Sequence, residues 1–206
     1  MKPLSDEMTE FIIARGSARA VNRRALAQLV YEGYADVAGA FRVRKEIALA
    51  VLERSLDLEQ CFIAWKGESP VGFQGLVERN GRPLNFRYKL IREHFGVLRS
   101  LLYFLLLDAR TRRKPVPGEI MFENLVVSAG ERKQGIGTRL VERAEAYARE
   151  NGYESVGMEV VDTNRIALRM FARMSYKTVK TRRFGILTKR AGFTGNHYLR
   201  KRMSAP

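Results

Sequence analysis

The sequence has very few of the residues that build disulfides and metal sites. Cys61 is its single cysteine, and His94 and His197 are its two histidines. One cysteine cannot form an intramolecular disulfide, and this set lacks the paired cysteines and histidines of a zinc finger. We therefore expect no disulfide scaffold and no metal site, and we expect Cys61 to be a buried strand residue rather than a nucleophile.

Long apolar runs are also missing. The longest run extends only from Ser100 to Leu107, which is too short to span a bilayer. The first ten residues, MKPLSDEMTE, lack the basic and then apolar pattern of a secretory signal. The 206 residues are enough to form a core without a covalent or metal staple. The composition thus predicts a single domain over residues 1–206, in a soluble, cytoplasmic protein.

Acidic residues are absent from the last part of the chain. Residues 164–206 contain twelve Lys and Arg and no Asp or Glu, and residues 82–114 contain nine Lys and Arg against two acidic residues. These two segments account for the whole net charge of +15. Such a field favours a polyanion: nucleic acid, an anionic membrane or a phosphate-rich ligand. A solvated surface explains the same charge equally well.

The spacing of apolar residues predicts a mixed α/β chain whose first half is mostly antiparallel. The expected helices cover residues 22–33, 43–56, 135–150 and 164–174, and the expected strands cover residues 11–13, 61–65, 71–77, 120–127, 156–161, 176–179 and 198–203. Asn22 is the expected cap of the first helix. Residues 82–114 are helical in character and end at the prolines of residues 115–118.

One segment carries a binding motif. Residues 125–138 read LVVSAGERKQGIGT, in which an apolar strand ends and two glycines open a long amphipathic helix. The first turn of a helix leaves backbone N–H groups unpartnered, and the helix dipole adds positive charge there. Gly135 and Gly137 let an anion approach this backbone, and Arg132 and Lys133 add cations. The segment therefore predicts a diphosphate site.

Two common diphosphate motifs do not fit. A Walker motif requires Gly-Lys followed by Ser or Thr, whereas Gly137 is followed directly by Thr138. A dinucleotide motif requires a third glycine at the position of Leu140. A glycine-rich helix start that binds no ligand is the alternative for this segment alone.

The spacing Arg-x-x-Gly-Ile-Gly-x-x-Leu over residues 132–140 resembles the coenzyme A signature of the GNAT (Gcn5-related N-acetyltransferase) superfamily. A second family element, Asn-x-x-Ala followed by Leu-Tyr and Gly-Phe, resembles Asn164, Ala167, Met170-Phe171 and Ser175-Tyr176. The resemblance implies a GNAT-like α/β fold with a mostly antiparallel sheet of six or seven strands flanked by helices. It places the cofactor-binding core at residues 119–176 and a helical insertion at residues 82–114.

The resemblance also implies how acetyl-CoA is bound. Backbone groups of Leu125 and Val127 would pair with the pantetheine arm, which would enter a splay between the fourth and fifth strands. Backbone N–H groups of residues 132–138 would hold the pyrophosphate, and Asn164 would reach the pantetheine from the other side. The residues implied to contact the cofactor are Leu125, Val126, Val127, Arg132, Lys133, Gln134, Gly135, Ile136, Gly137, Thr138, Asn164, Ala167 and Phe171.

Acetyl transfer from a thioester to an amine requires a deprotonated amine and a stabilised oxyanion. Strand alternation places Glu119, Met121, Glu123, Leu125 and Val127 on one face. Glu123 is the first candidate for the base and Glu119 the second, while Glu159 on the next strand is a weaker one. An N–H near Val127 is the expected oxyanion donor.

Phe171 stands where many members of the family have a tyrosine that protonates the departing thiolate. A phenyl ring has no proton to donate. The thiolate then leaves unprotonated, or Tyr176, Tyr198 or a water supplies the proton.

The sequence leaves the amine acceptor and the role of the insertion open. The apolar insertion with its basic end at Arg110–Lys114 is interpreted as a wall of the site for an anionic or partly apolar acceptor, as a homodimer interface, or as a membrane-surface contact. The leading hypothesis is an acetyl-CoA-dependent N-acetyltransferase. A CoA-binding sensor or scaffold is the first alternative. A nucleic-acid-binding protein ranks below it, because the chain lacks a helix-turn-helix, an RNA-binding aromatic motif and zinc spacing.

Overall fold

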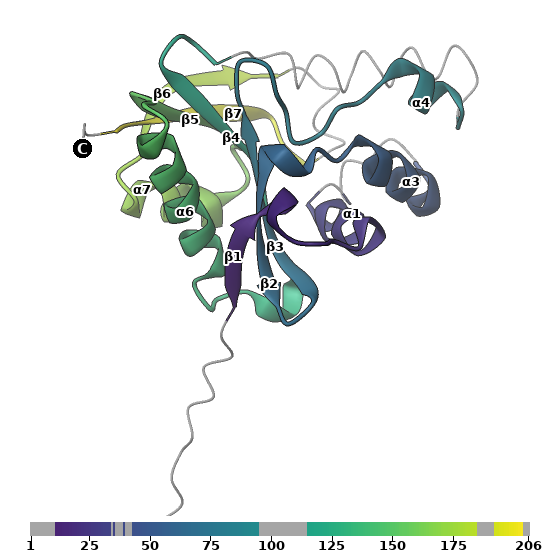
Figure 1. The fold of residues 1–206 in the computed structure, drawn as a ribbon. Helices are drawn as coiled ribbons and strands as arrows, with labels where there is room; N and C mark the ends of the chain where they lie inside the picture. Colours follow the sequence, from purple (N-terminus) through teal and green to yellow (C-terminus); the bar gives the residue numbers. More distant parts are fainter. Residues whose placement is uncertain are drawn as a thin grey trace, which may run out of the picture.

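The computed structural model describes residues 11–33, 35, 39, 43–94, 115–184 and 192–203. A seven-stranded sheet runs through it in the order β1-β2-β3-β4-β5-β7-β6 (Figure 1). The strands are β1 (Ile12–Arg15), β2 (Cys61–Lys66), β3 (Ser69–Val77), β4 (Glu119–Val127), β5 (Ser155–Val161), β6 (Lys177–Arg183) and β7 (Gly195–Arg202). The helices are α1 (Arg23–Glu32), α3 (Lys45–Ser55), α4 (Tyr88–Arg92), α6 (Ile136–Glu150) and α7 (Arg165–Arg173). Only β4 and β5 pair in parallel among these neighbours, which confirms the predicted mixed, mostly antiparallel sheet.

Helices cover the sheet on both faces. α1 and α3 lie against one face of β2, β3 and β4, where Phe73 and Trp65 are buried (Figure 1). α6 and α7 lie on the other face, and Leu140 of α6 is fully buried there. Asn22 caps α1 as predicted, because its side-chain oxygen accepts a hydrogen bond from the N–H of Ala25 at 3.1 Å. Cys61 is buried in β2, and burial raises the pKa of its thiol to about 12, as expected of a structural residue.

An extra residue in β4 interrupts its ladder with β3. Gly75 pairs with Glu123 and Phe73 pairs with Val126, so two residues of β4 lie opposite the single residue Gln74. Asn124, one of the two, has a left-handed φ of 59°. The side chain of Gln74 fills the resulting gap, since its Nε2 donates a hydrogen bond to the carbonyl oxygen of Glu123 at 3.1 Å. This geometry is a β-bulge.

The bulge changes which face the side chains of β4 occupy. Phe122 packs in the core beneath α6, and after the bulge Leu125 and Val127 pack against the same core. Val126 instead packs with α1 and α3. The prediction that Leu125 and Val127 share a face with Glu123 is therefore wrong, because one inserted residue reverses the alternation.

β4 and β5 pair along only part of their length. The paired residues run from Glu119 opposite Ser155 to Phe122 opposite Met158. β4 nevertheless continues to Val127, and β5 continues to Val161. The expected splay is present at the carboxyl ends of these strands, where α6 begins.

Several boundaries differ from the predicted ones. A two-residue turn at Gly67 and Glu68 joins β2 to β3, instead of the five-residue loop expected from residues 66–70. β6 and β7 are longer than predicted, because their polar ends carry no apolar alternation. Of the insertion, residues 82–94 contain α4, and residues 95–114, with the predicted apolar helix, lie outside the described part. No helix of the described residues is long and apolar enough to cross a bilayer.

Candidate functional site

The N-terminus of α6 is open to a ligand. Lys133 and Gly135 have positive φ values of 66° and 79°, which turn the chain sharply into the helix. No side chain caps α6, in contrast to α1 and α7. The amides of Ile136, Gly137 and Thr138 stand in the first turn, where a helix provides no internal acceptor. These backbone donors and the helix dipole are the groups that the predicted anion site requires.

Gly137 lies where three elements converge. A Cβ atom at this position would be 3.7 Å from Val127 Cγ2, 3.9 Å from Leu125 Cδ2 and 3.9 Å from Met170 Sδ. The helix start therefore faces the end of β4 and the side of α7 at van der Waals distance. Gly135 has no atom within 4 Å of the corresponding point, so the turn itself is open. A long, thin ligand that binds the helix start would reach the splay directly.

The basic loop before α6 is held to the sheet. Arg132 Nε donates a hydrogen bond to the carbonyl oxygen of Val127 at 3.0 Å. Glu131 pairs with Lys66 of β2 at 2.8 Å and accepts a hydrogen bond from Gln134 at 3.1 Å. Arg132 therefore contacts the end of β4 beside the splay. Gln134 stabilises the loop through its hydrogen bond to Glu131.

The amide of Val127 points toward the splay. The N–H of Ser128 donates to the carbonyl oxygen of Val71 in β3 at 2.9 Å. Successive amides of a strand point to opposite sides. The N–H of Val127 therefore points away from β3, to the side where β5 has separated from β4.

Glu123 lies on the opposite face of the sheet from α6, at the mouth of the splay. Phe122 and Met158 form the last pair between β4 and β5, and Glu123 and Glu159 are the next residues on the two strands. Burial raises the pKa of Glu123 to about 7, the guanidinium of Arg82 opposes this effect, and Glu159 adds to it. Arg82 Nη1 is 3.8 Å from Glu123 Oε1. A carboxyl with this pKa exchanges its proton near neutral pH.

Glu119 occupies a different environment from Glu123. It is 3% exposed, and its Oε1 accepts a hydrogen bond from the hydroxyl of Tyr198 and lies 3.2 Å from Arg200 Nε. Its other oxygen is 3.4 Å from the N–H of Val116. These contacts tie β4 to β7 and use both carboxylate oxygens.

Phe171 is buried against Tyr176, with the two rings 5.4 Å apart and nearly perpendicular. The hydroxyl of Tyr176 donates to Glu145 Oε1 at 2.8 Å. Burial, together with the charge of Glu145, raises the pKa of Tyr176. Lys201 Nζ lies 2.7 Å from the other oxygen of Glu145, so this carboxylate joins α6 to β7. Local spacing does not indicate this role, because Tyr176 and Lys201 lie far from α6 along the chain.

Asn164 is the cap of α7. Its Oδ1 accepts a hydrogen bond from the N–H of Ala167 at 3.1 Å. Both residues therefore have a local structural role, and the cofactor contact that the family resemblance implies for them stays a prediction.

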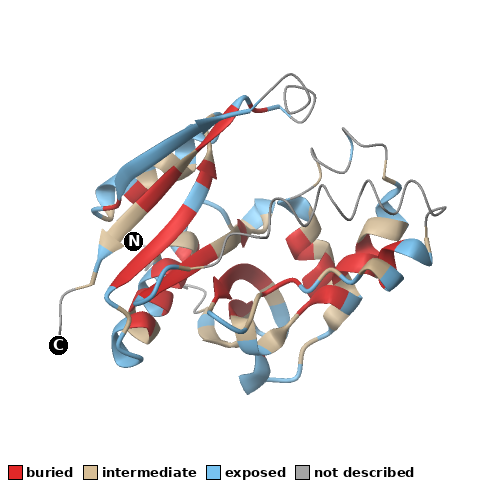
Figure 2. Cartoon of the chain, turned by 90° about the horizontal axis from the view of Figure 1, so that it is seen from above, coloured by how far each residue is buried: buried red, intermediate tan, exposed pale blue. Residues whose placement is uncertain are grey.

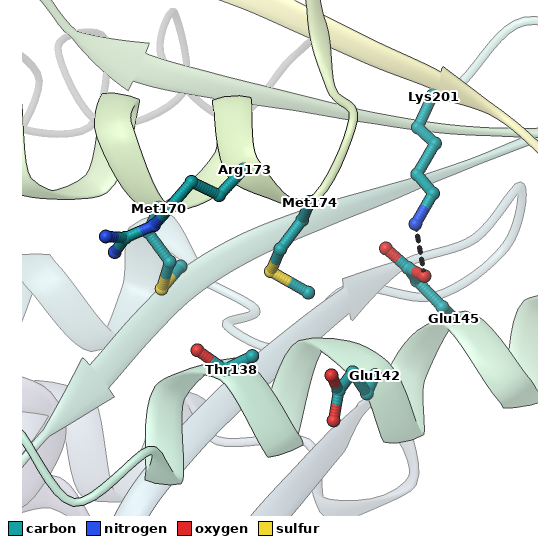
Figure 3. Close-up of a pocket in the computed structure, with 7 residues that line it drawn as sticks. All are labelled: Thr138, Glu142, Glu145, Met170, Arg173, Met174 and Lys201. Carbon is teal, nitrogen blue, oxygen red and sulfur yellow. Dashed lines mark hydrogen bonds and ion pairs between the residues drawn. The ribbon is translucent and has the colours of Figure 1, made fainter.

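A pocket of about 350 Å³ lies in the groove between α6 and α7 (Figure 3). Met170 and Met174 extend into it from the α7 side toward α6, and Arg173 and Thr138 stand at the end near the start of α6. The residues that line it are Thr138, Glu142, Glu145, Met170, Arg173, Met174 and Lys201. The groove thus extends along α6 from the start of the helix. Among the residues that line this pocket, Thr138 alone belongs to the cofactor-binding residues predicted above.

Comparisons with known proteins agree with this arrangement. The family model described as the acetyltransferase (GNAT) family matches residues 27–176. A solved acetyltransferase is similar with a TM-score of 0.60 and 15% identity, over 94% of this chain and 100% of the other. The ribosomal-protein-S18-alanine N-acetyltransferase from Escherichia coli has a TM-score of 0.54 and 14% identity, over 96% of each chain. A Bacillus subtilis acetyltransferase in complex with CoA has a TM-score of 0.54 and 14% identity, over 95% and 100%.

No curated protein sequence matches the chain. At the identities above, the solved structures show a common fold and not a common substrate. The family match is of a different kind, because it covers well over half of the sequence and includes the α6 start, the splayed strands and α7. On that ground the chain belongs to the GNAT family of acetyltransferases.

Proposed function

We propose that the protein is an acyl-CoA-dependent N-acetyltransferase that brings acetyl-CoA and a primary amine together on the two sides of the β4–β5 splay. The observation that supports this most directly is the position of the uncapped α6 start at one side of the splay and of Glu123 at the other. Direct attack in such a ternary complex needs no acyl-enzyme, consistent with the buried thiol of Cys61.

The residues present fit acetyl-CoA. The first-turn amides of α6 and the loop from Arg132 would hold the pyrophosphate, because they combine free donors with positive charge. Val127 and Leu125 would line the pantetheine arm. Val126 would anchor this end of β4 by packing on the opposite face, against α1 and α3. Asn164, Ala167 and Phe171 would face the arm from α7 and its cap. Acetyl-CoA supplies the acetyl thioester.

Glu123 is the proposed general base. An amine acceptor is mostly protonated at neutral pH and must lose a proton before it attacks. A carboxylate with a pKa of about 7 is ionised in part at that pH and is basic enough to accept the proton directly or through a water. Glu119 is the weaker candidate, since Tyr198 and Arg200 already use its carboxylate.

The reaction also needs a hydrogen-bond donor for the oxyanion and a proton for the departing thiolate. The N–H of Val127, which points into the splay, would donate a hydrogen bond to the developing oxyanion. Phe171 provides no proton, and the hydroxyls of Tyr176 and Tyr198 both donate to carboxylates. We therefore propose that the thiolate leaves without a tyrosine acid and takes its proton from water.

Thiol release in the presence of acetyl-CoA and a panel of amines, amino acids, aminoglycosides and peptides tests this function. Turnover with one acceptor class, lowered about 10²–10⁴-fold in Glu123→Gln, is the expected result. Calorimetry with CoA runs alongside. Binding without turnover on any acceptor supports the alternative that Phe171 raises, a CoA-binding sensor, and absence of CoA binding contradicts both. A single domain over residues 1–206, cytoplasmic location and a homodimer stay predictions.

A further inference from the structure

The two outer strands of the sheet are strongly basic. β6 and β7 contain seven Lys and Arg and no Asp or Glu. All seven residues of β6 are exposed, which Figure 2 shows as a continuous pale blue strand at the margin of the sheet. This charge is separate from the α6 start, which the proposed acetyltransferase function uses.

The register of the two strands places most of these cations on one face. Lys177 pairs with Arg200, Lys180 with Tyr198, and Arg182 with Asn196. Directly paired residues point to the same face, and Tyr198 and Arg200 contact Glu119 on the face away from α6 and α7. Lys177, Lys180 and Arg182 therefore share that face with Arg200 and Arg202.

The two carboxylates that contact β7 on this face are already engaged. Glu119 lies against Arg200, and Glu159 accepts a hydrogen bond from Asn196 at 2.5 Å. Within the described ranges, Lys177, Lys180 and Arg182 form no ion pair. Three neighbouring cations thus remain without a neutralising partner among these residues.

An aromatic ring stands at the end of the same strand. Phe184 follows Arg182 and Arg183, is 37% exposed and packs edge-on against Phe193, with 6.1 Å between the ring centres. Charged residues often protect an edge strand from pairing with another chain, but that role needs no exposed ring. Cations beside an aromatic ring are instead typical of surfaces that bind single-stranded nucleic acid, where phosphates meet the charges and a base stacks on the ring.

We propose that β6 and Phe184 bind single-stranded RNA through its backbone, with Lys177, Lys180 and Arg182 on phosphates and a base stacked on Phe184. Binding of this kind reads no sequence, so it requires none of the recognition motifs that the chain lacks. A membrane surface fits less well, because stable attachment to a bilayer takes an apolar face or a lipid anchor in addition to basic charge. The large apolar side chains of β6 and its end are only Val179 and Phe184, separated by Lys180, Thr181, Arg182 and Arg183.

Fluorescence anisotropy with a labelled oligouridine of about 16 nucleotides tests the proposal. This length is the upper end of the site that one single-strand-binding domain such as an OB fold covers. The affinity is measured between about 50 and 200 mM salt. Each phosphate contact on a single strand contributes about −0.7 to the slope of log affinity against log salt. The Lys177→Gln/Lys180→Gln/Arg182→Gln variant should therefore flatten the slope by about 2. Phe184→Ala should weaken binding about tenfold and leave the slope unchanged.

The matched control is Arg44→Gln/Lys45→Gln/Arg79→Gln, which removes the same charge from exposed positions near α3 and after β3. It should keep the wild-type slope. Equal flattening in both triple variants, absence of RNA binding at the lowest salt, or binding to phosphatidylserine vesicles but not to RNA would each overturn the proposal. Thermal unfolding shows that the variants are folded, and none of these results depends on CoA binding or acetyl transfer.

Discussion

Replacing Glu123 with glutamine should stabilise the protein by an amount that depends on pH. Burial raises the pKa of this carboxyl from 4.5 to about 7. Between these values the folded protein keeps a proton that the unfolded chain has released, so the free energy of unfolding falls as pH rises through this window. At 1.36 kcal/mol per pKa unit, the full cost above pH 7 is about 3 kcal/mol. Glutamine has a similar shape and no charge, and it avoids this cost.

Thermal unfolding of the wild type and Glu123→Gln checks this prediction. Near pH 8 the variant should melt about 6–12 °C higher, because 1 kcal/mol shifts the midpoint by about 2–4 °C in a protein of this size. Near pH 4 both carboxyl and amide are neutral and the two curves should coincide. Glu142→Gln, at an exposed position of α6, is the control and should show no such pH-dependent gain.

A variant that is less stable than the wild type near pH 8 would refute the reasoning, because it would mean that Arg82 stabilises the ionised carboxylate by more than burial costs it. A gain of equal size at both pH values would also refute it. The expected outcome, with greater stability and less acetyl transfer, would show that the site keeps a carboxylate at the expense of stability.

Three further substitutions test other parts of the structure. Gly137→Glu should fold, because an acidic residue suits the first turn of a helix, and should lose CoA binding in calorimetry; Gly130→Glu, which adds the same charge in open space, should keep it. Asn124→Val should lower the free energy of unfolding in urea by about 1–2 kcal/mol more than Asn124→Gly, because only glycine adopts the positive φ without strain, and equal losses would contradict the bulge geometry. Glu145→Ala should cost about 3 kcal/mol in the same assay, because it leaves Tyr176 and Lys201 without their acceptor, while Glu142→Ala should cost little; a small effect at Glu145 would mean that water replaces it.

Local signals explain what the sequence could predict. The cap at Asn22, the glycines before α6 and the apolar spacing of α6 depend on neighbours within a few residues, and the structure confirms them. The family resemblance also came from one contiguous segment, residues 119–176, and the family match confirms it.

The features that the sequence missed depend on partners far along the chain. Arg82 lies beside Glu123, and Glu145 holds Tyr176 and Lys201, through contacts that no local spacing reports. The face of Leu125 was mispredicted because an Asn in a strand gives no sign that it will adopt a left-handed conformation. The predicted strand at residues 176–179 is shorter than β6 because β6 lies at the edge of the sheet and buries none of its residues, so its sequence has no apolar alternation.

The bulge at Asn124 divides β4 into two segments whose side chains alternate between the faces of the sheet in opposite phase. The segment before it sets the face of Glu123, toward the proposed amine side, and the segment after it sets the faces of Leu125 and Val127, toward α6. Without the extra residue, Leu125 and Val127 would lie on the same face as Glu123. The bulge therefore lets one strand present an acidic side chain to the proposed amine side and apolar side chains to the opposite side, where α6 begins.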